Sequence, residues 1–228
     1  MVAILGYAGI ATEALRAQAG PKTSSSAVRI AMVGASPGSA RWPPSDGRWL
    51  ALHRTASGDR LELVTTRLSV TEDRCGGRDT VVAVSGLPAD AKVPFLIQWD
   101  RIKAGPVESG WSQPRFLYPG ENQPVVLKDK RAFNLTAYGI AEPGMIYNYR
   151  LVLSSGGIYQ TLAQLHVVSM DGPPKIVWAG DLDRDRRLDV LADLTTDYVG
   201  HQYVLYVSSL APPGQHVAEV TRLGLPGC

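Results

Sequence analysis

Short stretches in which apolar and polar residues alternate, or in which a few apolar residues follow one another, recur along most of the chain. They are rich in Val, Leu, Tyr and Thr, and they are bounded by Gly, Pro, Asp or Ser. A period of two is typical of β-strands, and the bounding residues are typical of turns. The segments that fit are residues 28–34, 49–53, 60–70, 81–85, 94–99, 115–118, 124–127, 132–138, 147–153, 159–168, 176–178, 188–191, 203–209 and 217–223.

This pattern predicts an all-β fold with sandwich-like antiparallel sheets, because helical periodicity is convincing only in residues 10–17. We expect residues 1–27 to be a flexible arm or a residual signal segment, and residues 28–168 to form the main β domain. The sequence SMDGPP begins at residue 169 and breaks the pattern. We expect residues 169–228 to form a C-terminal unit that packs on the main domain, since about 60 residues fold only marginally alone.

Composition narrows the class of protein further. The 228 residues are 45% hydrophobic and carry a formal net charge of +2, with 23 Lys and Arg against 21 Asp and Glu. The apolar fraction excludes disorder along the whole chain, and the small net charge argues against a nucleic acid partner. No apolar run reaches the ~20 residues that a transmembrane helix needs, so no transmembrane segment is expected.

The candidate chemistry is concentrated in one acidic loop near the C-terminus. Asp181, Asp183, Asp185 and Asp189 stand at relative positions 1, 3, 5 and 9. Calcium takes about 6–8 oxygen ligands, which alternate carboxylates and the backbone carbonyl of Arg187 at position 7 can supply. Four carboxylates this close repel one another unless a cation lies among them. The spacing therefore predicts a Ca²⁺ site with these five residues as ligands.

The flanking residues separate this loop from an EF-hand. Position 12 is Ala192 rather than Glu, and the residues before the loop have the pattern of a strand. The stretches AGDLD (179–183) and LDVL (188–191) resemble the strand–loop–strand calcium motif GDxDxDGxxDLxV of the FG-GAP/VCBS family, the integrin-type β-propeller repeat. The resemblance extends over residues 176–209 at most and is to a single unit. It implies a structural calcium ion between two strands.

Two residues of the loop depart from that motif. Arg184 and Arg186 stand at positions 4 and 6, where the family has glycine. Position 6 normally has a positive φ, which costs on the order of 1 kcal/mol for a residue other than glycine. Together with Arg187 these arginines also neutralise the acids. A metal-free turn held by Arg–Asp pairs, each worth little at a surface, is the alternative interpretation.

The two cysteines, Cys75 and Cys228, bear on the compartment. Both lie in turn-like sequence, and neither has the spacing of a zinc ligand. They form either a disulfide or two free thiols. We expect the disulfide, and with it a periplasmic or extracellular location. The apolar residues 2–11 and the A-x-A sequence at 17–19 fit a secretory signal, although a positively charged start is missing.

Trp99 and Trp111 frame a loop of aromatic, polar and glycine residues. Such a mixture is typical of a surface that binds a protein or a glycan, because tryptophan is enriched at binding hot spots. The alternative is that both side chains pack in the core.

No catalytic residues are predicted. The G-x-S-x-G sequence at 34–38 is interpreted as a turn, because prolines at 37, 43 and 44 prevent the helix that a nucleophile elbow requires. We therefore expect a non-enzymatic, secreted or periplasmic binding protein with a structural calcium site, for example an inhibitor- or immunity-like partner of a secreted enzyme. A secreted hydrolase, either carbohydrate-active or an esterase, is the alternative.

Overall fold

A computed structural model describes residues 28–34, 48–72, 78–88, 91–197 and 200–226. Within these ranges the chain forms sixteen strands, and every strand pairing is antiparallel. The only regular helical element of the described ranges is the short 3-10 helix η1 (Ser208–Leu210). The all-β prediction is therefore confirmed.

The strands form three sheets, which we name the first, second and central sheets. The first sheet has the order β1 (Arg29–Ala31), β5 (Phe95–Gln98), β2 (Trp49–Thr55), β3 (Gly58–Glu72) and β4 (Arg78–Ser85), with β6 (Gly105–Pro106) beside β3. The second sheet has the order β12 (Ile158–Ser169), β11 (Met145–Ser155), β10 (Ala132–Glu142) and β9 (Asn122–Val126). The central sheet has the order β16 (Ala218–Pro226), β15 (Gly200–Val207), β14 (Asp189–Asp193), β13 (Lys175–Asp181) and β7 (Glu108–Trp111), with β8 (Arg115–Phe116) also on β13.

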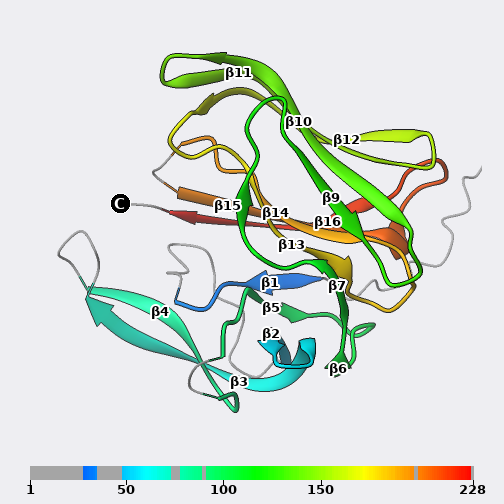
Figure 1. Ribbon diagram of the computed structural model, residues 1–228. Coiled ribbons are helices and arrows are strands. Elements are labelled where there is room, and N and C mark those ends of the chain that lie inside the picture. The colour runs from blue at the N-terminus through cyan, green and yellow to red at the C-terminus, as the bar shows by residue number, and fades with distance from the viewer. Residues whose placement is uncertain (1–27, 35–47, 73–77, 89–90, 198–199, 227–228) are drawn as a thin grey trace, which may run out of the picture.

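The central sheet lies between the other two, and both of its faces are buried (Figure 1). Successive side chains of a strand point to opposite faces. Val190 and Ala192 accordingly belong to the core against the second sheet, whereas Leu191 belongs to the core against the first sheet. A strand buried on both faces needs apolar residues at every position. This requirement explains the uninterrupted apolar runs in β13, β14 and β15.

A smaller third core lies on the other face of the first sheet. Strand β3 is 15 residues long, and its second half leaves β2 to pair with β4. The sheet therefore curls over its own outer face. Val64 and Val82 then pack in one cluster with Trp49.

One buried polar cluster connects the first sheet to the central sheet. The indole Nε1 of Trp178 on β13 donates to Ser109 Oγ on β7, at 2.8 Å, and to Asp59 Oδ2 on β3, at 3.2 Å. Ser109 Oγ donates to the same Asp59 oxygen at 2.6 Å. Each polar atom thus finds a partner from another strand, which fixes the two sheets relative to each other.

Each predicted strand segment overlaps a strand of the structure, while β6 and β7 lie in residues 99–111, for which the sequence predicts a loop. Strands β13 to β16, which come from the predicted C-terminal unit, make up most of the central layer, and the division into two domains stays a prediction. Within the described residues, no helix has the length and apolar character needed to cross a membrane. Cys75, Cys228, Ser36 and residues 1–27 lie outside the described ranges, so the structure leaves the predicted disulfide and signal segment untested.

Candidate metal centre

The acidic loop connects two neighbouring strands of the central sheet. Strand β13 ends at Asp181 and β14 begins at Asp189, and Gly180 pairs with Asp189 in the antiparallel ladder. The two ends of the loop therefore lie side by side. Gly180 is required here, because a Cβ at this position would lie 2.1 Å from the carbonyl oxygen of Glu108 on β7.

The loop brings three of the predicted ligands together. Carboxylate oxygens of Asp181, Asp183 and Asp189 all lie within 4.8 Å of one another, a spacing that could hold a metal ion. Asp181 is 5% exposed and Asp189 is fully buried, so two of the three carboxylates are removed from water. We refer to these three residues as the aspartate triad.

Asp181 carries an unsatisfied oxygen. Its Oδ2 accepts a hydrogen bond from the backbone N–H of Arg186 at 3.0 Å. Its Oδ1 is buried and has no hydrogen-bond partner among the described residues. Burial raises the pKa of Asp181 above its usual value, the backbone N–H groups of Arg186 and Arg184 act in the opposite direction, and the charges of Asp185 and Asp183 raise it further. A buried carboxylate oxygen without a donor is costly, and a bound cation is one of the few groups that can remove this cost.

Asp189 is held from two sides of the loop. Its Oδ2 accepts from the backbone N–H of Leu182 at 2.7 Å, and its Oδ1 accepts from both the backbone N–H and the Oγ of Ser208, each at 2.8 Å. Burial nevertheless raises the pKa of Asp189 to about 8, with a contribution from the charge of Asp183. Hydrogen bonds orient this carboxylate, but within the described ranges no cationic side chain forms an ion pair with it.

The other two predicted ligands are placed differently. The carboxylate of Asp185 lies outside the triad and accepts from Arg187 Nε at 2.8 Å and from Ser208 Oγ at 3.1 Å. Arg187–Asp185 is the ion pair that the described loop forms within itself. The role of the Arg187 backbone carbonyl as a ligand stays a prediction. The Arg–Asp pairing expected for a metal-free turn therefore involves Asp185 and leaves the three triad carboxylates without an arginine.

Arg184 and Arg186 adopt the backbone conformation that the sequence motif requires. Both have a φ of 65°, in the left-handed region where glycine is favoured. Arg184 also reaches out of the loop, where its Nη2 donates to the carbonyl of Lys103 at 3.0 Å and its Nε to the carbonyl of Pro106 at 3.1 Å. The loop therefore keeps the path of a glycine-containing turn although it holds two arginines there.

Sequence reasoning missed two serines that complete the surroundings of the triad. Ser208 and Ser209 follow β15, and the hydroxyl of Ser209 donates to Asp183 Oδ2. Antiparallel pairing of β14 with β15 sets Val190 opposite Tyr206, which brings Ser208 beside Asp189. The sequence does contain a signal for these two residues, since they form a pair of serines directly after the apolar strand that follows the acidic loop. Hydroxyl and carboxylate oxygens are both hard ligands suited to Ca²⁺ or Mg²⁺.

Trp99 and Trp111 do not share a surface. Trp99 is 6% exposed and packs in the core between the first and central sheets. Trp111 lies on β7, paired with Ala179, and packs against the core on the opposite side of the central sheet. Trp99 is thus buried and Trp111 partly buried, and the binding role of the two residues stays a prediction.

Comparison with known proteins adds no identification. No protein-family model matches the chain, and no curated protein or solved structure matches it significantly.

Proposed function

We propose that this protein is a non-enzymatic binding module of the periplasm or extracellular space, stiffened by a structural calcium ion at the aspartate triad. The buried, unpartnered Oδ1 of Asp181 beside two further carboxylates is the observation that carries the proposal. The likeness of the loop to an FG-GAP/VCBS unit supports calcium as the metal.

Calcium suits the chemistry of the ligands and the proposed compartment. The available donors are carboxylate and hydroxyl oxygens, without the nitrogen or sulfur that zinc prefers. Extracellular modules commonly bind Ca²⁺ with dissociation constants of ~0.1–1 mM. An ion at the triad would connect the end of β13, the start of β14 and the neighbourhood of η1. It would thereby stiffen the centre of the molecule without taking part in chemistry.

Thermal unfolding with and without calcium tests the metal. A ligand bound only by the folded state stabilises it by about 2.7 kcal/mol at a hundredfold excess over the dissociation constant. The melting temperature in millimolar Ca²⁺ should exceed that in excess EGTA, and Mg²⁺ should have a smaller effect. Asp181→Ala and Asp183→Ala should each abolish the difference, while the matched control Asp171→Asn, an exposed acid outside the loop, should keep it. Superimposable melting curves would contradict the proposal.

The binding role needs its own experiment. An inhibitor- or immunity-like role predicts that the tagged protein captures one stoichiometric partner from a periplasmic or culture extract. The capture should require Ca²⁺. Turnover of a panel of glycans or esters by the purified protein would instead favour the hydrolase alternative.

A further inference from the structure

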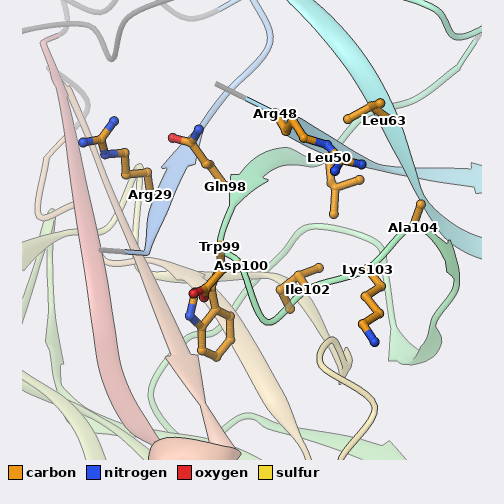
Figure 2. A pocket seen from close by; sticks show the side chains of 10 residues that line it. All are labelled: Arg29, Arg48, Leu50, Leu63, Gln98, Trp99, Asp100, Ile102, Lys103 and Ala104. Atoms are coloured by element: carbon orange, nitrogen blue, oxygen red, sulfur yellow. The ribbon is translucent and has the colours of Figure 1, made fainter. Parts of the chain in front are cut away.

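A cavity of about 750 Å³ opens where β5 ends, on the side of the first sheet (Figure 2). Its lining comes from β1, β2, β3, the end of β5 and the segment that leads from β5 to β6. The lining residues are Arg29, Arg48, Leu50, Leu63, Gln98, Trp99, Asp100, Ile102, Lys103 and Ala104. The volume is within the ~300–1,000 Å³ that small-molecule sites occupy.

The floor of the cavity is apolar. Leu50, Trp99 and Ile102 are buried members of the core between the first and central sheets. Leu63 contributes a further apolar wall, and its side chain is 49% exposed although it stands opposite Leu50 in the β2–β3 ladder. An exposed leucine directly beside buried core residues leaves apolar surface that a ligand could cover.

The rim of the cavity is cationic. Arg29, Arg48 and Lys103 are exposed, and none of them has an ion-pair partner among the described residues. Asp100 is the one acid of the lining, so the three cations leave a formal charge of +2 on it. The guanidinium of Arg101 lies 5.8 Å from the centre of the Trp99 ring and adds positive charge nearby. A low-dielectric cleft with charges of one sign concentrates the field and attracts anions.

The segment that leads from β5 to β6 forms one wall of the cavity, and hydrogen bonds from Arg184 hold it in place. The two hydrogen bonds from Arg184 to the carbonyls of Lys103 and Pro106 anchor this segment to the acidic loop. Because this segment is already ordered without a ligand, binding carries no entropy cost for ordering it, and the affinity is higher as a result.

We propose that this cavity binds a small organic anion with an apolar body. The hydrocarbon or aromatic part lies on Leu50, Leu63 and Ile102, and a carboxylate, sulfonate or phosphate group lies among the cations of the rim. The site goes beyond the function proposed above, because neither the metal nor a protein partner takes part in it.

Two fluorescent probes that differ only in charge test the assignment. 8-Anilinonaphthalene-1-sulfonate carries a sulfonate on an aromatic body, and N-phenyl-1-naphthylamine has the same body without it. We expect one sulfonate probe per folded chain, with an affinity at least tenfold above that of the neutral probe. Added salt should lower the affinity for the sulfonate probe and leave the affinity for the neutral probe unchanged, because salt screens charges but not apolar contacts.

Variants then locate the site. Arg48→Gln combined with Lys103→Gln should lower the affinity for the sulfonate probe about tenfold and leave the neutral probe within about twofold. Arg67→Gln combined with Lys128→Gln removes the same charge from exposed positions elsewhere and should change neither probe. Leu63→Ser should lower the affinity for both probes, because it removes apolar surface from the wall of the cavity. Equal affinities for the two probes, several probes per chain, or equal losses in the two double variants would overturn the proposal.

Discussion

Arg186 holds a conformation that suits glycine, and its exposed side chain forms no hydrogen bond or ion pair with the described residues. Arg186→Gly should therefore stabilise the calcium-free protein by about 0.5–1 kcal/mol, because the relief of the positive φ exceeds the entropy that glycine adds to the unfolded chain. It should also raise the affinity for Ca²⁺, since one positive charge leaves the loop. Urea unfolding and calcium titration by calorimetry measure the two effects.

Arg184→Gly is the informative comparison for that variant. The two arginines share a φ of 65°, but Arg184 also holds the carbonyls of Lys103 and Pro106. Replacing Arg184 by glycine relieves the same strain but removes two hydrogen bonds. The Arg184→Gly protein should therefore gain less stability than the Arg186→Gly protein, or be less stable than the parent. An Arg186→Gly protein that is no more stable than the parent would show that the loop imposes no strain.

At the scale of elements, one buried carboxylate ties three neighbouring strands of the central sheet together. Asp193 on β14 is 2% exposed and bonds Lys175 Nζ on β13 at 3.1 Å and His201 Nδ1 on β15 at 2.8 Å. Burial opposes its ionisation, but the bonds from His201 and Thr195 and the charge of Lys175 outweigh burial and lower the pKa of Asp193 to about 2. The ionised form is thus favoured by the fold.

Asp193→Asn should cost about 2–3 kcal/mol near neutral pH. Since the folded pKa lies below the unfolded value, this stabilisation is complete above about pH 4 and is lost as the pH falls towards about 2. About half of the difference between the parent and the variant should remain near pH 3. Urea unfolding of the parent and the variant, near neutral pH and near pH 3, measures this difference in stability. Glu219→Gln, which breaks an exposed pair with Arg222, should cost under about 1 kcal/mol, and an equal cost for both variants would contradict the assignment.

Elements with a two-residue apolar period could be predicted from the sequence, and those without it could not. Strand β10 alternates in burial over its first half and overlaps a predicted strand, although it extends to Glu142, beyond the predicted end at residue 138. Strand β7 reads Glu-Ser-Gly-Trp and has no such period, because its place is specified by contacts with Gly180 and Trp178 on β13, which is distant in the chain. For the same reason the spacing of the aspartates predicted the triad, but it could not show that Ser208 and Ser209, which lie about twenty residues further along the chain, bond to Asp189 and Asp183.

At the scale of the whole molecule, neither the first two sheets nor the C-terminal unit can bury its apolar faces alone. Both large cores take side chains from the central sheet. A fragment ending at residue 168 should therefore fail to fold, as should a fragment of residues 169–228, while the full chain should unfold in one transition. Circular dichroism in the near ultraviolet and size-exclusion chromatography on the three proteins test this. A fragment 28–168 with a cooperative melt of its own would instead establish an independent main domain.

The sandwich-like fold class followed from the pattern, but the three layers did not. Continuous apolar runs at 176–179, 190–192 and 203–207 indicate burial on both faces, whereas β9 and β10 of the second sheet alternate. Strand β5 of the first sheet is also apolar and buried at successive positions, so such runs alone do not identify the middle layer. Which sheet lies in the middle depends on contacts between β7 and β13 across more than sixty residues of chain. Such long-range pairing leaves no local signal.

The position of the middle layer in the chain has a consequence for biosynthesis. Strands β13 to β16 are made after all strands of the first and second sheets. At ~5–20 residues per second, the ribosome needs several seconds to complete them. During that interval the two earlier sheets have no surface to cover their apolar faces. We therefore expect these apolar faces to stay exposed on the nascent chain, and folding to be completed only after the last strands emerge.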